Sequence, residues 1–243
     1  MQTENFSERL GIDIATTYRQ LVANVFDAFS ACKADGMRDD TTRQTLYRNL
    51  IMLAAWLDSE DKAMRVAQAI EGRLVASLLS ILHTSLALSA ENVLMATLAA
   101  AIKVLQTTPG QSTPTLLELV IRTMQTFSGN PTVQSFAILV LYYSVKDGDL
   151  KRVALSMFAL HRLRDVLLAH RENAKIVYDI FCCLSFFLVD DPTTTRWAME
   201  LNFELLVRAA QRSFADNVRI RDACRGLQNF FAHVHSLLPY KFD

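Results

Sequence analysis

Five stretches of this chain repeat the same helical pattern of apolar residues, and this repetition is the strongest constraint on its fold. Counted from Arg43, Glu91, Asn130, Asn173 and Asp216, apolar or small residues recur at offsets of 3, 7, 11 and 14. These offsets follow the period of about 3.6 residues that marks one face of an α-helix. The successive starts lie 48, 39, 43 and 43 residues apart. We therefore predict a chain built from helical repeats of similar length.

The apolar stripe is unbroken in the first two copies and fits least well in the fifth. In the first four copies it consists of Leu46, Leu50, Ala54, Leu57; Leu94, Leu98, Ile102, Leu105; Val133, Ala137, Leu141, Ser144; and Ile176, Ile180, Leu184, Phe187. In the fifth copy Arg219 occupies the first position, before Ala223, Leu227 and Phe230. Its neighbours Val218 and Ile220 are the candidates to supply the missing apolar contact.

Composition and turn residues also favour long helices. Hydrophobic residues make up 51% of the chain, and only seven glycines and five prolines interrupt it. Asn130 is expected to cap a helix whose first residue is Pro131, because the first helical position does not need an N–H donor. The segments 155–169 and 194–214 are each predicted to be one helix.

Two segments resemble armadillo repeats. The first is 155–188, with apolar residues on both sides of the turn at 171–173, and the second contains Ala223, Leu227, Gln228, Asn229 and Phe230, similar to the signature Ala-x-x-x-Leu-x-Asn-Leu. The resemblance covers roughly residues 41–233, and HEAT repeats or another helical solenoid are the alternatives. It implies an all-α, right-handed α-solenoid of about four to five armadillo-like repeats. We expect one domain over 1–243, with a capping helix in 1–40, repeats in 41–233 and a tail in 234–243.

The resemblance also implies a binding groove. In armadillo proteins the helix with this signature lines a concave groove that binds extended or helical peptides. The corresponding positions, at offsets 9 and 13, are Met52, Trp56, Ala100, Val104, Leu139, Tyr143, Cys182, Phe186, Arg225 and Asn229. Importin-alpha-like members have Trp and Asn there, and only Asn229 matches, so binding of nuclear localisation signals is not expected. The large apolar groups favour a partner helix or short linear motif, although aromatic residues at this spacing are also typical of a core.

Basic residues near the C-terminus suggest a second kind of partner. Arg208, Arg212, Arg219 and Arg221 are candidates for a ridge that binds RNA or an acidic protein. Acidic residues are interleaved with them, so a solvated surface with ion pairs is the simpler interpretation. Lys plus Arg and Asp plus Glu are both 25, which gives no strong overall attraction to nucleic acid.

Motifs for catalysis, metal binding or membrane insertion are absent from the sequence. It contains no GxxxxGK[ST], GxGxxG, HExxH or GxSxG pattern, and its four cysteines lack zinc-site spacing. No apolar run approaches the roughly 20 residues of a membrane span. The first residues lack the features of a signal peptide, so a cytoplasmic or nuclear location is expected. We predict a non-catalytic protein-interaction scaffold or adaptor without a cofactor or metal, working as a subunit of a larger assembly.

Overall fold

The structure, a computed structural model, describes residues 14–57, 74–108, 110–146 and 150–237. Within these residues it contains helices and no strand, which confirms the all-α prediction. The helices are α2 (Ile14–Ala34), α3 (Asp40–Leu57), α5 (Leu74–Ala87), α6 (Glu91–Thr107), α7 (Pro114–Thr126), α8 (Pro131–Lys146), α9 (Lys151–Ser156), α10 (Ala159–Ala169), α11 (Ala174–Leu188), α12 (Pro192–Glu200), α13 (Phe203–Ser213) and α14 (Val218–Leu237). Residues 1–13 of the expected capping segment and 238–243 of the expected tail lie outside the described residues.

The chain divides into two compact units, residues 1–111 and 112–243. In unit 1, α2 packs against α3, α5 packs against α6, and α3 packs against α6. Leu46 and Leu50 of α3 and Leu94 and Leu98 of α6 are fully buried. The stripe predicted for the first two copies therefore forms part of the core of this unit. None of the described helices combines the length and the apolar character that crossing a bilayer requires.

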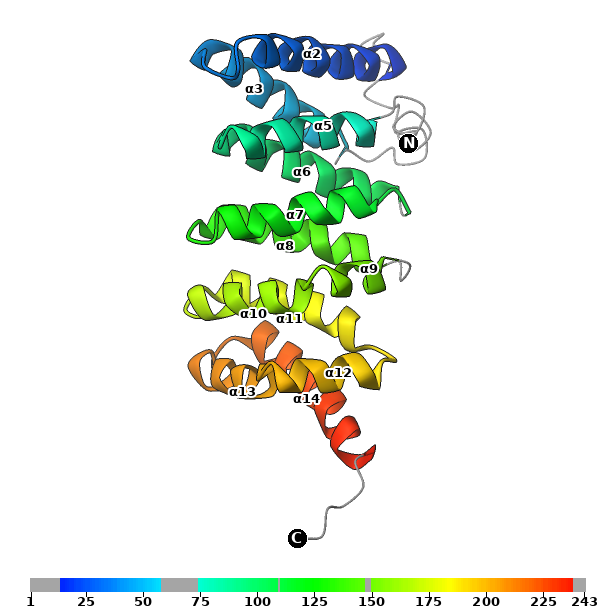
Figure 1. The fold of residues 1–243 in the computed structure, drawn as a ribbon, viewed down its shortest axis with the longest axis vertical. Helices are drawn as coiled ribbons and strands as arrows, with labels where there is room; N and C mark the ends of the chain where they lie inside the picture. The colour runs from blue at the N-terminus through cyan, green and yellow to red at the C-terminus, as the bar shows by residue number, and fades with distance from the viewer. Residues whose placement is uncertain (1–13, 58–73, 109, 147–149, 238–243) are drawn as a thin grey trace, which may run out of the picture. The chain divides into compact units, whose positions relative to one another are not determined.

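Unit 2 consists of two layers of helices. The helices α7, α10 and α13 form one layer, and α8, α11 and α14, called the inner helices below, form the other (Figure 1). The central inner helix, α11, packs against both α8 and α14. The stripe residues of α8 and α11 are all buried, as predicted.

Each inner helix of unit 2 begins after an asparagine. The side-chain oxygens of Asn130, Asn173 and Asn217 accept hydrogen bonds from the N–H groups three residues later, at 3.1, 3.2 and 3.2 Å. A cap of this kind satisfies a donor that has no partner within the helix. The predicted start of α8 is confirmed, but the fifth copy begins at Asn217 and not at Asp216.

This shift of one residue explains the weak stripe of the fifth copy. The buried residues of α14 are Ile220, Cys224, Leu227, Phe231 and Val234. Counted from Asn217, three of them occupy offsets 3, 7 and 14. Ile220 therefore supplies the apolar contact that the sequence lacked at Arg219, whereas Val218 is exposed.

Two segments predicted to be single helices are each broken into two. The backbone of Phe158 separates α9 from α10 with a φ of 62°, and that of Asn202 separates α12 from α13 with a φ of 65°. A left-handed residue cannot continue a right-handed helix, so the chain turns at each of them. The two residues lie 44 positions apart, as do the starts of α10 and α13 and those of α11 and α14. Hence α9–α11 and α12–α14 are two copies of one three-helix group.

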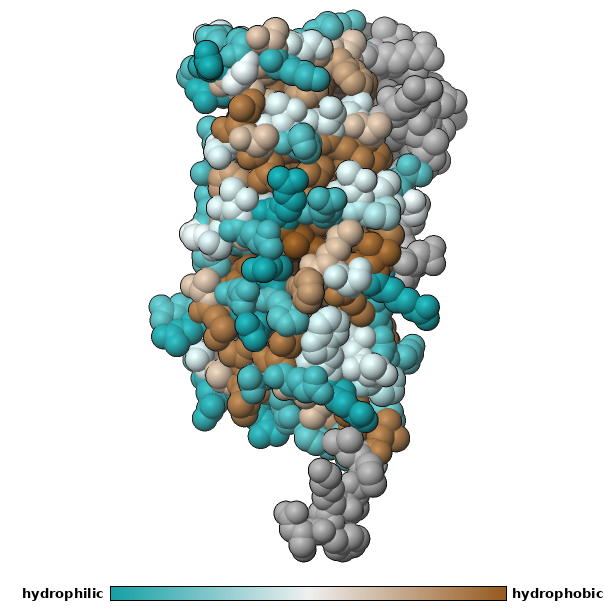
Figure 2. Space-filling model, viewed as in Figure 1, coloured by the Kyte–Doolittle hydropathy of each residue, from teal (hydrophilic) through white to brown (hydrophobic). Residues whose placement is uncertain are grey.

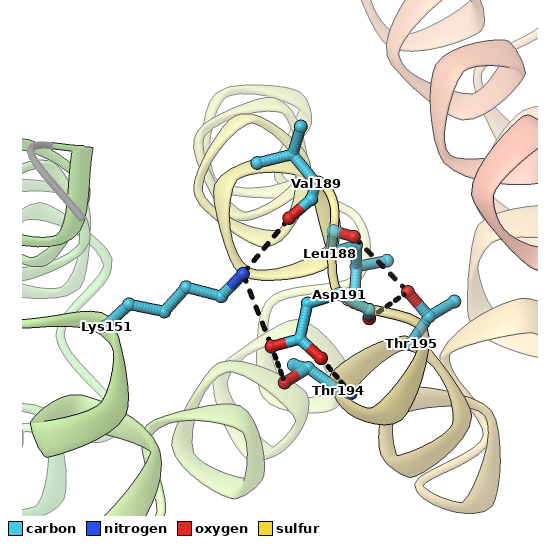
Figure 3. A network of polar contacts seen from close by, with 6 residues as sticks. All are labelled: Lys151, Leu188, Val189, Asp191, Thr194 and Thr195. Carbon is cyan, nitrogen blue, oxygen red and sulfur yellow. Dashed lines mark hydrogen bonds and ion pairs between the residues drawn. The ribbon is translucent and has the colours of Figure 1, made fainter.

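A polar network joins the two groups (Figure 3). The Lys151 ammonium reaches from α9 to the Val189 carbonyl oxygen at 3.2 Å and to the Asp191 carboxylate at 3.5 Å. Asp191 caps α12 by accepting hydrogen bonds from the Thr194 N–H and hydroxyl at 2.9 and 2.7 Å. Burial favours a higher pKa for Asp191, but these hydrogen bonds and Lys151 outweigh it and lower the pKa below its usual value.

Candidate binding surface

Three aromatic side chains meet where α8 and α11 pack against each other. The Tyr142 ring lies 4.9 Å from that of Tyr143 and 5.0 Å from that of Phe186, and it stands nearly perpendicular to both. All three side chains are half-buried. The structure thus brings two of the predicted groove residues together through Tyr142. Tyr142 was not among the predicted groove residues, although the adjacent pair Tyr142 and Tyr143 is a sequence signal for an aromatic surface.

Leu139 and Cys182 lie one helical turn before Tyr143 and Phe186, and both are half-buried. Burial raises the pKa of the Cys182 thiol, and a hydrogen bond with Tyr178 only partly opposes this effect. At neutral pH Cys182 is therefore a protonated thiol and a weak nucleophile. The chemistry of this surface is that of apolar and aromatic contact.

A buried polar contact joins α8 to α11 about two helical turns before the aromatic cluster. Ser135 donates a hydrogen bond to the Asp179 carboxylate at 2.9 Å. The Lys175 ammonium pairs with the same carboxylate at 2.7 Å and also contacts the Ser135 hydroxyl. Asp179 is buried, whereas the Lys175 side chain is 64% exposed. One cation thus neutralises the buried carboxylate and remains accessible from solvent.

In α14, the corrected register places other residues at the groove positions. Counted from Asn217, offsets 9 and 13 are Gly226 and the half-buried Phe230. Arg225 and Asn229, the residues predicted for these positions, are exposed, and Arg225 pairs with Asp222 at 3.4 Å. A Cβ atom added at Gly226 would meet no atom within 4 Å, so the surface is open beside Phe230.

The remaining predicted groove residues belong to unit 1. Met52 is 55% exposed and Trp56 is half-buried on α3. Ala100 and Val104 of α6 are buried, so the second copy presents no side chain to solvent at these offsets. The physical reason is that α6 packs against both α3 and α5 and is covered on most of its surface.

The arginines predicted to form a basic ridge project in different directions. Arg208 and Arg212 are exposed on α13, where Arg208 pairs with Glu204 at 2.5 Å. Arg219 and Arg221 are exposed on α14. They are two positions apart, so their side chains point about 200° apart around the helix axis. A hydrogen bond with Cys182 raises the pKa of Tyr178, and the nearby Arg219 guanidinium acts in the opposite direction.

A groove that the sequence did not indicate runs between α10 and α13. It has a volume of about 560 Å³ and is lined by Leu167, Leu168, Arg171, Glu172, Val177, Leu206, Ala209, Ala210, Ser213 and Phe214. Figure 2 shows apolar atoms between polar ones over these two helices. This groove is separate from the aromatic cluster, which lies on α8 and α11.

The described residues contain no group of three His, Cys, Asp or Glu side chains able to hold a metal ion. No family model, curated protein or solved structure matches this chain. The surface chemistry of the described residues is therefore the basis for inferring a function.

Proposed function

We propose that this protein is a non-catalytic scaffold or adaptor that binds a helix or short linear motif of a partner, as a subunit of a larger assembly. Its repeats, over roughly residues 41–233, would form an armadillo-like α-solenoid. The observation that carries the proposal is the half-buried cluster of Tyr142, Tyr143 and Phe186 across two neighbouring inner helices.

Aromatic side chains supply much of the binding energy at protein interfaces. Each buries roughly 150–250 Å² when a partner covers it. Perpendicular contacts between rings are a favoured arrangement and contribute beyond the buried area. Residues of this type, close together and already held by neighbouring rings, lose little side-chain entropy when a partner covers them. The cluster therefore has the composition and rigidity of an interface anchor.

The repeated three-helix group supports the solenoid proposal. The group α12–α14 follows α9–α11 with the same order of helices and a shift of 44 residues. In repeat proteins each layer packs only on its neighbours, so successive inner helices form a continuous binding surface. The cluster lies on two such successive helices.

The alternative partner is RNA or an acidic protein that binds the arginines of α13 and α14. The ion pairs of Arg208 and Arg225 with acidic neighbours weigh against it, because those charges are already partly neutralised. Titration with oligonucleotides at two salt concentrations distinguishes the proposals. A steep loss of affinity with salt favours the alternative, and no binding at low salt excludes it.

The test is a double substitution, Tyr143→Glu with Phe186→Glu. Two charges in the cluster should abolish the capture of the partner in native extract, measured by cross-linking mass spectrometry. Lys146 is exposed three residues after Tyr143 and provides a cross-linking site next to the cluster. Cross-links from this lysine to a partner should disappear in the variant.

A matched control is Leu168→Glu with Leu205→Glu, which adds the same charge at two side chains that are 50% and 62% exposed on α10 and α13. The control should keep the cross-links. Circular dichroism and thermal melting should be unchanged in both variants. Unfolding of the Tyr143/Phe186 variant would show that these residues belong to the core, and equal loss of cross-links in both variants would contradict the proposed site.

A further inference from the structure

We infer that Ser135, Lys175 and Asp179 are positioning residues for the candidate binding surface. These three residues, called the polar bridge below, set the register of α8 against α11 and thereby hold Tyr142 in contact with Phe186. The inference rests on the proposed function and names the device that keeps the rings of its binding site in place. It follows from the position of the polar bridge, from its burial and from the contact between the next pair of inner helices.

The polar bridge and the ring contact join the same two helices in the same register. Ser135 and Asp179 are 44 residues apart, and so are Tyr142 and Phe186. On each helix the ring follows the residue of the polar bridge by seven positions, which is about two helical turns, or roughly 10 Å. Residues at this separation lie on nearly the same side of a helix. A shift of α8 along α11 that breaks the polar contact therefore also separates the rings.

The contact that fixes this register is polar although it lies in the core. Ser135 and Asp179 are both 8% exposed, and the hydroxyl donates to the carboxylate at 2.9 Å. The Lys175 ammonium lies 2.7 Å from the same carboxylate and is the one cation that pairs with it among the described residues. Buried ion pairs seldom stabilise a fold more than apolar side chains of similar volume, and their best-attested role is to fix a register.

The next pair of inner helices, α11 and α14, lacks both contacts. The position 44 residues after Asp179 is Ala223, which has no polar side-chain atom. Phe230 lies 44 residues after Phe186, but the ring contacts within the described part of the chain include none between these two side chains. The polar bridge and the ring contact thus occur together between α8 and α11.

Cys182 lies between the polar bridge and the rings and can report a shift of the two helices. It follows Asp179 by three residues and precedes Phe186 by four, so these three side chains lie along one face of α11. Cys182 is half-buried, whereas the other three cysteines of the chain are fully buried. A shift between α8 and α11 exposes the Cys182 thiol, and the rate of its alkylation measures that exposure.

The test measures alkylation of Cys182 in the full chain by N-ethylmaleimide, with mass spectrometry to locate the label. Lys175→Met leaves the Asp179 carboxylate buried without its cation, so we expect labelling about fivefold faster than in wild type. Burial and, after it, the Asp179 charge raise the pKa of this thiol. An Asp179 without its cation disfavours the thiolate further, so electrostatics alone predicts slower labelling.

Two more variants test the parts of the polar bridge. Ser135→Ala keeps both charges and removes the hydrogen bond between the helices, so it should also accelerate the labelling of Cys182. Lys175→Arg keeps the positive charge and should retain the wild-type rate. Unchanged labelling in both Lys175→Met and Ser135→Ala would overturn the inference.

A matched control separates positioning from stability. Val207→Ala removes buried methyl groups from α13, outside the contact between α8 and α11. The variants are compared at urea concentrations that give them equal free energies of unfolding, so that global unfolding exposes Cys182 equally in each. Faster labelling in Lys175→Met than in Val207→Ala supports the inference. Equal labelling would show that the polar bridge contributes only to stability, and the inference would be wrong.

The connection to binding is measured by the cross-links from Lys146 to a partner in native extract. They should decrease in Lys175→Met and Ser135→Ala and remain in Lys175→Arg. Faster labelling of Cys182 with unchanged cross-links would overturn the inference, because the position of the rings would then not control binding. That result would leave the scaffold proposal intact, since the double glutamate substitution in the aromatic cluster tests it separately.

Discussion

The two three-helix groups of unit 2 have the same plan but differ along one side of their inner helix. Phe181 and Leu188 of α11 are fully buried, and Ser185 between them is half-buried. The shift of 44 residues places Arg225, Ala232 and Asn229 at the equivalent positions of α14, and all three are exposed. In both groups an asparagine caps the inner helix. In both groups a left-handed residue also precedes the middle helix, α10 or α13.

This difference separates the residues that build a repeat from those that join it to the next one. The stripe at offsets 3, 7 and 14 is buried in both groups, because every inner helix packs on its own group. Of these two helices, only α11 is apolar on the side that contains Phe181, the position equivalent to Arg225 of α14. The helix α11 packs against α14. The same side of α14 is exposed and carries Arg225 and Asn229. Asn229, which the resemblance placed in the binding groove, belongs to this exposed side.

The largest expected difference between the two groups is the change in unfolding free energy when the side chain is shortened at the equivalent positions Phe181 and Arg225. Phe181→Ala should lower the free energy of unfolding by about 3–5 kcal/mol, because it leaves a cavity among fully buried neighbours. Arg225→Ala should change it by less than about 0.5 kcal/mol, because the side chain is exposed and its ion pair with Asp222 is solvated. Urea denaturation of both variants measures the difference.

A control variant tests whether the polarity of α14 is specific to its position. Arg225→Phe should leave the unfolding free energy nearly unchanged and should increase self-association in sedimentation velocity, because it places an aromatic group on an exposed side. A loss of several kcal/mol in Arg225→Ala would show that this side of α14 is packed, and the distinction between the two groups would be wrong.

A smaller difference between the groups lies where each begins. The first helix of the second group, α12, is capped by Asp191, whereas the first helix of the other group, α9, follows Leu150 and has no side-chain cap. Asp191→Ala should lower the unfolding free energy by about 1 kcal/mol, the usual cost of losing a cap. Asp191→Asn should cost less, because asparagine also caps helices and only the attraction to Lys151 is lost.

The same residue predicts a dependence on pH. The pKa of Asp191 is lowered in the folded protein, so its contribution to stability is present above the unfolded pKa of about 4 and is lost as the pH falls through the folded value. The difference in stability between wild type and Asp191→Asn should therefore shrink below about pH 4. A difference that stays constant down to pH 2 would show that the carboxylate charge contributes nothing.

The sequence predicted the repeated stripe because burial leaves a periodic signal in the residue types. It also predicted the cap of α8 from Asn130, because capping depends on one side chain close in the sequence. It did not predict the breaks at Phe158 and Asn202. A left-handed residue leaves no periodic signal, and phenylalanine rarely adopts this conformation, so nothing in 155–169 separated it from a continuous helix.

The candidate site was predicted in part for the same reason. Tyr143, Cys182 and Phe186 follow from counting along helices that start with a recognisable cap, and the structure places them on α8 and α11. Tyr142 was missed because its importance comes from contact with another helix, which no count along one helix can show. In the fifth copy the count began one residue early at Asp216, and this selected Arg225 and Asn229 where the structure has Gly226 and Phe230.

The last prediction exchanges the two left-handed residues and has the smallest expected effect. Asparagine tolerates a positive φ better than phenylalanine does, because its short polar side chain can bond locally. Phe158→Asn should therefore stabilise the protein by about 0.5 kcal/mol, a gain limited by loss of the ring contact between Phe158 and His161 at 5.5 Å. Asn202→Phe should destabilise it by a similar amount, about 0.5 kcal/mol. Thermal melting of both single variants and of the double exchange measures these changes in stability. Two single variants that both stabilise or both destabilise the protein would show that the breaks in the two groups are not equivalent.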